Sequence, residues 1–157
     1  MEPRLTYVIG RLDRILRRRI SAAVEPAGLS LPAYTALSVL RAQDGLSNAH
    51  LARRSLVTPQ SMNEVLSGLV EHGYVRRIAE PGQGRAIRIE LTPAGSRVLE
   101  SCERAVEEVE QQMLGDFDAG ERASLRDALL RCGRSLEREI EERAGILRAA
   151  NDKDGAA

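Results

Sequence analysis

The chain has 157 residues, of which 43% are hydrophobic and 29% charged, a size and composition that fit one globular domain. No apolar run approaches the ~20 residues that span a membrane, and the N-terminus lacks the apolar core of an export signal, so we expect a cytoplasmic protein without a membrane partner. The formal net charge is zero, yet residues 1–93 carry 13 Arg/Lys against 8 Asp/Glu and residues 94–157 carry 10 against 15. The basic first part favours contact with phosphate, unless chance produced the asymmetry.

Apolar residues spaced three or four apart predict four helices in the first half of the chain. The first covers residues 4–25, with its arginines mostly off the apolar face. Three shorter helices follow, each preceded by a Ser or Thr that can cap free backbone N–H groups. They run from 31 to about 43, from 48 to 54, and from 59 to the turn at Gly73. Two short helices joined tightly, the second with a small-polar outer face, are typical of a helix-turn-helix.

Next, the sequence pattern changes to that of β-strands. Segments 74–79 and 85–91 are rich in β-branched residues, and apolar residues alternate with polar ones in the second. The sequence between them, Glu-Pro-Gly-Gln-Gly at 80–84, consists of turn residues. A helix-turn-helix followed by a hairpin predicts a mainly α fold, the winged helix-turn-helix, in which the small hairpin is the wing.

Two longer helices complete the prediction. One opens at Thr92-Pro93, and the other follows Asp118 and Glu121, which have the spacing of a capping box. We expect the last helix over 120–148 and a disordered tail over 151–157. The helices at 4–25 and 120–148 have apolar stripes wider than a small winged-helix core can cover, which predicts a homodimer. The expected interface residues are Leu5, Ile9, Leu12, Leu129, Leu136 and Ile140.

Four segments, at 51–54, 58–62, 69–75 and 91–95, have an order and spacing that resemble the MarR family of multiple-antibiotic-resistance regulators. The resemblance implies a single domain over 1–150, in which 30–93 bind DNA while 4–25 and 94–148 are dimerisation helices. It also implies an obligate homodimer that acts as a ligand-responsive regulator, and we expect a repressor. Its recognition helix would enter the major groove of a pseudo-palindromic double-stranded DNA operator, and its wing the adjacent minor groove.

Three residues depart from the family pattern. Gln83 stands where many members carry an Asp that braces the wing arginine. Glu64 and Gly68 stand in the middle of the recognition helix, where many members carry Arg. The base preference therefore cannot be transferred from the family. Gly68 would fit a close approach to the duplex, or it could be neutral drift.

Short polar side chains and arginines on these elements are the candidate DNA contacts. Gln and Asn can pair bidentately with adenine, Ser and Thr can bind bases or phosphates, and an arginine at the wing can enter a narrow minor groove. The alternative for each residue is an ordinary solvated surface. The candidates are Ser47, Asn48, Arg54, Thr58, Gln60, Ser61, Asn63, Ser67 and Arg85.

The resemblance also implies an effector pocket between the dimerisation helices and the winged part, because family members commonly respond to small aromatic or lipophilic acids. Arg14, Arg18 and Tyr34 would supply cations and an aromatic ring, although ordinary helix packing explains the same residues.

The remaining reactive residues give no sign of catalysis. Cys102 and Cys132 lie on apolar stripes and are expected to be reduced core thiols. Two histidines without suitable neighbours predict no metal site, and we expect neither a cofactor nor an enzyme. The alternative function is a winged-helix protein-interaction module without specific DNA binding, suggested by the zero net charge, Glu64 and Gln83.

Overall fold

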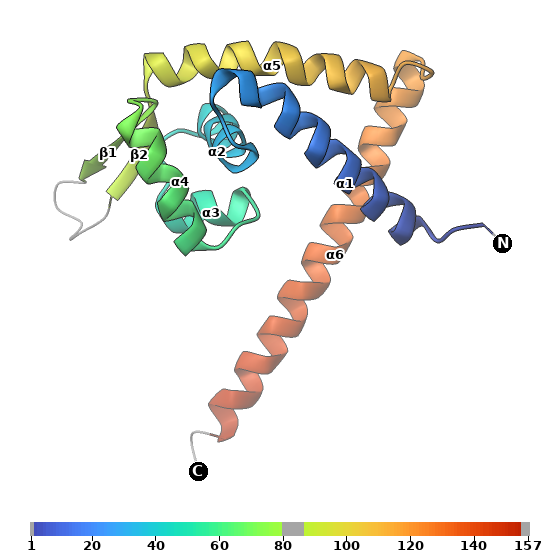
Figure 1. Ribbon diagram of the computed structural model, residues 1–157. Helices are drawn as coiled ribbons and strands as arrows, with labels where there is room; N and C mark the ends of the chain where they lie inside the picture. Colours follow the sequence, from blue (N-terminus) through green and yellow to red (C-terminus); the bar gives the residue numbers. More distant parts are fainter. Residues whose placement is uncertain (1, 80–86, 155–157) are drawn as a thin grey trace. The chain divides into compact units, whose positions relative to one another are not determined.

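The computed structural model describes residues 2–79 and 87–154, with side chains for 2–79 and 87–138. The chain divides into two compact units, one up to Gln112 and one from Met113 onward, and each is described by itself. The first unit contains helices α1–α5, the 3-10 turn η1 and strands β1 and β2, and the second contains α6 (Figure 1). The bounds are α1 Leu5–Val24, η1 Glu25–Ala27, α2 Leu31–Ala42, α3 Asn48–Arg54, α4 Pro59–Glu71, β1 Val75–Ala79, β2 Ile87–Leu91, α5 Pro93–Met113 and α6 Ala119–Asp154.

Helices α2, α3 and α4 each begin at a side-chain cap that the sequence predicts. The Ser30 hydroxyl accepts a hydrogen bond from the Ala33 N–H at 3.3 Å, and Ser47 accepts one from His50 at 3.3 Å. The Thr58 hydroxyl accepts from the Ser61 N–H at 3.1 Å. Each cap satisfies a backbone donor that the first helical turn leaves free, which fixes the helix start locally.

The hairpin is held at its base by the loop after α2. Strands β1 and β2 are antiparallel, with Val75 opposite Leu91 and Ala79 opposite Ile87. On the other edge of β2, the Ile89 N–H donates to Leu46 O at 2.9 Å, and the predicted wing is therefore anchored to the helix-turn-helix. Residues 80–86, which include the predicted turn and the start of the second predicted strand, lie outside the described residues.

The core lies between the helix-turn-helix, α2, the hairpin base and the start of α5. Its largest fully buried side chains are Leu37, Leu40, Leu51, Met62, Leu66, Ile89, Leu99, Val24 and Cys102. The apolar side of α4 is buried at Met62, Leu66 and Leu69, whereas Val70 is 40% exposed. Val70 follows Leu69 directly and points about 100° further around the helix, away from the core.

The two cysteines differ. Cys102 is buried, and burial raises the pKa of its thiol, so the group stays protonated and inert. Cys132 is exposed on α6, so the prediction of a core thiol is wrong for that residue within this chain. Among the described side chains of α6, the apolar stripe is exposed, with Leu129 46% and Leu136 63% exposed.

Helix α6 starts at the predicted capping box. The Glu121 N–H donates to the Asp118 carboxylate at 2.9 Å, and the Asp118 N–H donates to the Glu121 carboxylate at 2.8 Å. The helix continues to Asp154, beyond position 148, and so includes residues 151–154 of the segment expected as a tail.

The turn between α3 and α4 contains a strained residue. Leu56 has φ of 56°, and its side chain is 83% exposed. The Val57 N–H donates to Ala52 O at 3.1 Å, and the Leu56 N–H donates to Arg53 O at 3.3 Å. These two bonds close the end of α3 in the manner of a Schellman motif, in which glycine usually occupies the left-handed position.

Replacing Leu56 by glycine is expected to stabilise the fold. A left-handed L-residue costs about 1–2 kcal/mol, and glycine gives back part of that gain through its freer unfolded chain. We expect Leu56→Gly to raise the free energy of unfolding by about 0.5–1 kcal/mol, measured by urea denaturation. Leu56→Ala keeps a Cβ and is the control, for which we expect no rise in the free energy of unfolding. An equal rise in both variants would contradict the claim that the backbone at position 56 is strained.

Candidate nucleic-acid interface

The outer face of α4 presents a row of polar side chains. Gln60, Asn63 and Ser67 are exposed and lie three or four residues apart, on the side opposite the buried Met62, Leu66 and Leu69. Thr58 and Ser61 are exposed at the start of the same helix. The structure therefore gathers five of the nine predicted DNA contacts on one surface helix.

Hydrogen bonds at the start of α4 and along it distinguish four of these five residues. The Thr58 hydroxyl donates to Ser61 Oγ at 3.0 Å, and the Ser67 hydroxyl donates to Asn63 O at 2.9 Å. The hydroxyl protons of Thr58 and Ser67 are thus already engaged in hydrogen bonds within the chain. The side-chain amides of Gln60 and Asn63 make no hydrogen bond within the described part of the chain, so both retain the donor and acceptor needed to read a base edge.

Two predicted residues at the start of α3 have structural partners. Ser47 is the cap of α3, and Asn48 is only partly exposed. Asn48 Nδ2 donates to Pro59 O at 3.2 Å, which ties the beginning of α3 to the beginning of α4. Its Oδ1 is buried and has no partner among the described residues. Asn48 therefore links the two helices of the helix-turn-helix, a contact that the sequence analysis did not predict.

The arginines near α4 are not equivalent. Arg76 faces Glu90 across the hairpin, and its Nη2 lies 2.8 Å from the carboxylate. Arg77 is exposed and has no ion-pair partner within the described residues. It lines a small cleft of about 80 Å³ together with Asn48 and Asn63. Arg77 is thus the better phosphate candidate of the two, whereas the predicted Arg85 lies outside the described residues.

A larger pocket opens on the surface of α2. It has a volume of about 400 Å³, and its lining includes Tyr34, Ser38, Val39 and Arg54. Burial raises the pKa of the Tyr34 phenol, which therefore keeps its proton. The predicted Tyr34 thus lies in a pocket. Arg14 and Arg18 are not among its lining residues in this chain, and Arg54, predicted as a DNA contact, supplies the cation.

The described residues show neither a metal site nor a membrane helix. No group of three or more His, Cys, Asp or Glu side chains among them could hold a metal ion. None of the helices in that part of the chain is long and apolar enough to cross a bilayer.

Helices α3 and α4, the hairpin anchored beside them and the polar face of α4 define a winged helix-turn-helix protein. The MarR family profile matches residues 27–86. The Mycobacterium tuberculosis HTH-type transcriptional repressor Rv2887 is 36% identical over 129 residues, which cover 82% of this chain and 93% of that protein. The chain belongs to the MarR family, and it is a transcriptional regulator.

Solved structures of the same relative agree with this assignment. Rv2887 crystallised in complex with DNA has a TM-score of 0.70 and 32% identity, covering 84% of this chain and 99% of that one. Rv2887 in complex with salicylic acid has a TM-score of 0.69 and 34% identity, covering 83% of this chain and 97% of that one. The mainly α winged fold predicted from the sequence is confirmed.

Proposed function

We propose that the chain is a cytoplasmic homodimeric repressor that binds a pseudo-palindromic double-stranded DNA operator and is released by a small aromatic acid. The observation that supports DNA binding best is the exposed face of α4. On that face, the side-chain amides of Gln60 and Asn63 make no hydrogen bond to any other described residue. The related Rv2887 is a repressor that crystallised with DNA. We place the protein in the cytoplasm in this proposal because a transcriptional regulator must reach the chromosome.

The proposed contacts divide into those that read bases and those that hold the backbone. Gln60 and Asn63 lie one helical turn apart and would enter the major groove, where an amide can pair bidentately with adenine. Ser61 adds a short polar group. Arg77 would neutralise a phosphate beside the groove, and Arg85 at the wing would reach the minor groove.

Removing either free amide is expected to relax base preference. Gln60→Ala or Asn63→Ala removes one bidentate contact per half-site and reduces discrimination at one base pair by about 1–3 kcal/mol. Competition binding with operators changed at single positions measures this loss. Ser67→Ala is the matched control with a smaller effect, because that hydroxyl proton is already bonded to Asn63 O. Equal weakening on the operator and on random DNA would contradict base reading by these residues.

The effector site of the proposal is the pocket on α2. A carboxylate there would pair with the Arg54 guanidinium, and the Tyr34 phenol could donate a second hydrogen bond. Arg14 and Arg18 on α1 would complete the site only if a second copy of the chain brings them to it. The relative Rv2887 crystallised with salicylic acid, which has this chemistry.

Arg54→Gln is expected to weaken salicylate binding ten-fold to a hundred-fold, since a charge-assisted hydrogen bond contributes about 1.5–3 kcal/mol. Calorimetric titration without DNA measures this directly. Arg53→Gln is the control, because Arg53 is the adjacent exposed arginine and does not line the pocket. If both variants lose the same affinity, the pocket on α2 is not the site.

A second candidate function is a protein-interaction module without specific DNA binding. Zero net charge and the exposed Glu64 on α4 favour it, because both oppose the approach of phosphate. DNA binding that falls steeply with added salt distinguishes the repressor from this alternative.

A further inference from the structure

Glu64 lies near the centre of the outer face of α4. It is exposed, and it stands two residues from both of the buried residues Met62 and Leu66. Because two residues turn an α-helix by about 200°, the Glu64 side chain points almost directly away from the core. Gln60 lies one helical turn earlier on the same side of the helix. Any molecule that covers the outer face of α4 therefore contacts the Glu64 carboxylate.

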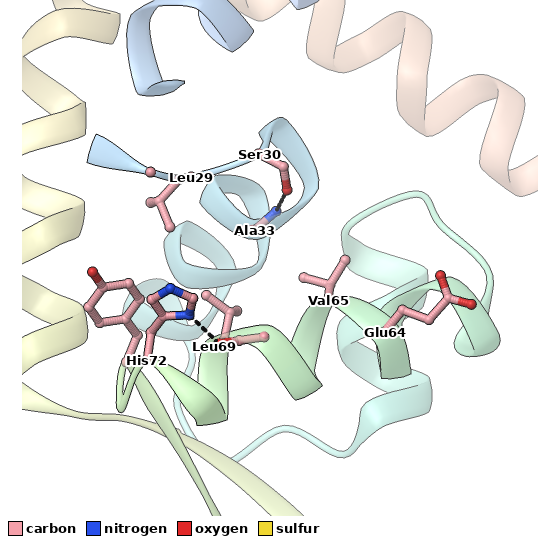
Figure 2. Close-up of a pocket in the computed structure, with 10 residues that line it drawn as sticks. Leu29, Ser30, Ala33, Glu64, Val65, Leu69 and His72 are labelled. Atoms are coloured by element: carbon pink, nitrogen blue, oxygen red, sulfur yellow. Dashed lines mark hydrogen bonds between the residues drawn. The ribbon is translucent and has the colours of Figure 1, made fainter. Parts of the chain in front are cut away.

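The Glu64 carboxylate has no hydrogen bond or ion pair within the described part of the chain. Figure 2, which shows the open depression between the start of α2 and α4, has this carboxylate turned away from Leu69 and His72, with no dashed line reaching it. Helix α4 contains no lysine or arginine that could pair with it. Gly68, one helical turn later, has no side chain to cover it, and a Cβ built there would meet no atom within 4 Å. The carboxylate is therefore open to an external partner.

A free carboxylate at this position restricts which DNA can approach α4. Phosphates repel it, and a carboxylate enclosed in an interface without a hydrogen-bond donor opposes binding strongly. Tight binding therefore requires that the carboxylate of Glu64 meets a donor of the DNA itself. In the major groove, the donors on the base edges are the amino groups of cytosine and adenine.

Of these two bases, cytosine suits a carboxylate better. Adenine presents the N7 acceptor beside its N6 amino group, and an acceptor repels a carboxylate, which has no hydrogen to donate. Cytosine presents only its N4 amino group. Guanine presents two acceptors, and thymine presents an acceptor and a methyl group, so neither offers a donor. The acceptor-only chemistry of Glu64 therefore selects cytosine, whereas an amide at the same position would suit adenine.

We propose that Glu64 is a specificity-determining residue that accepts a hydrogen bond from the N4 amino group of one cytosine in each half-site. Its charge weakens binding to most sequences and permits tight binding where a cytosine lies opposite it. The same charge that opposes phosphate thus serves the choice of sequence, and it does not require a protein-interaction module. This inference rests on the proposed function, because α4 must enter the major groove.

Binding selection from a randomised double-stranded DNA library, read by sequencing, tests this proposal with the full chain. It gives the preferred base at each position of the half-site for the wild type and for Glu64→Gln. At one position of each half-site, the wild type should prefer cytosine over guanine by about 10-fold to 100-fold. Glu64→Gln should change that preference to adenine and leave the other positions unaltered, because an amide both donates and accepts. Since Glu64 is exposed, the variant should melt at the wild-type temperature.

Glu71→Gln is the matched control, because Glu71 is the other charged residue of α4 and is exposed at the end of the helix. Both substitutions remove one negative charge, so both should strengthen binding to random DNA. Only Glu64→Gln should change a preferred base. The proposal would be overturned if Glu64→Gln and the wild type prefer the same base at every position, or if the wild type prefers guanine or thymine at the position that changes. A wild type that enriches no sequence would contradict the proposed function and this inference with it.

Discussion

Gly95→Ala is expected to destabilise the winged unit by about 3 kcal/mol or more. Gly95 is buried at the start of α5, where an added Cβ would overlap the Tyr74 carbonyl oxygen and lie 2.8 Å from Leu91 Cδ1. The backbone cannot easily retreat, because the Thr92 hydroxyl donates to Gly73 O at 2.6 Å and accepts from the Gly95 N–H at 3.0 Å. The end of α4, β1 and α5 therefore meet at one glycine.

Thermal unfolding measures this effect, and we expect the melting temperature to fall by roughly 6–12 °C. Gly68→Ala is the matched control in the same unit. Its Cβ meets nothing within 4 Å, and alanine gains up to about 1 kcal/mol over glycine inside a helix. If the Gly95→Ala variant has the same melting temperature as the wild type, the close packing at the start of α5 is able to adjust, and this prediction is wrong.

Leu12→Asp is expected to convert a dimer into a monomer and to weaken operator binding by about 10²–10⁴. On α1, Leu5 is 77%, Ile9 is 46% and Leu12 is 40% exposed, an apolar stripe that the described residues of the first unit leave uncovered. A carboxylate buried in a dimer interface without a partner opposes association strongly. The monomer holds a single recognition helix and loses the gain from binding two half-sites together.

Size-exclusion chromatography with light scattering gives the mass of each variant. Ser21→Asp is the control, since Ser21 is exposed and lies nine residues along α1, about two and a half turns from Leu12 and so on the opposite side. The predicted interface would be contradicted if the wild-type protein is a monomer at micromolar concentration, or if the Leu12→Asp protein remains dimeric.

Features set by neighbouring residues were predictable from the sequence. The caps at Ser30, Ser47 and Thr58 and the box formed by Asp118 and Glu121 each involve groups within one helical turn, so short spacings reveal them. The family resemblance added the order of the helices and strands. The described part of the chain agrees with the predicted caps and with the predicted order.

Features set by distant residues were not predictable from spacing. Asn48 bonds Pro59 O across the turn, Arg54 joins Tyr34 in a pocket, and Gly68 faces the gap beside α2. Each depends on how two helices pack. The Arg76–Glu90 pair is an exception, since the hairpin register places those residues opposite each other.

Footprinting on the DNA upstream of the gene that encodes this chain tests the central proposal most directly. Two recognition helices in a two-fold dimer enter successive major grooves on one face of the duplex. The account therefore predicts two protected half-sites about 10–10.5 base pairs apart, with protection that weakens as salt rises. Uniform weak protection, or none at concentrations where the protein is dimeric, would contradict an operator-binding repressor and favour the protein-interaction module.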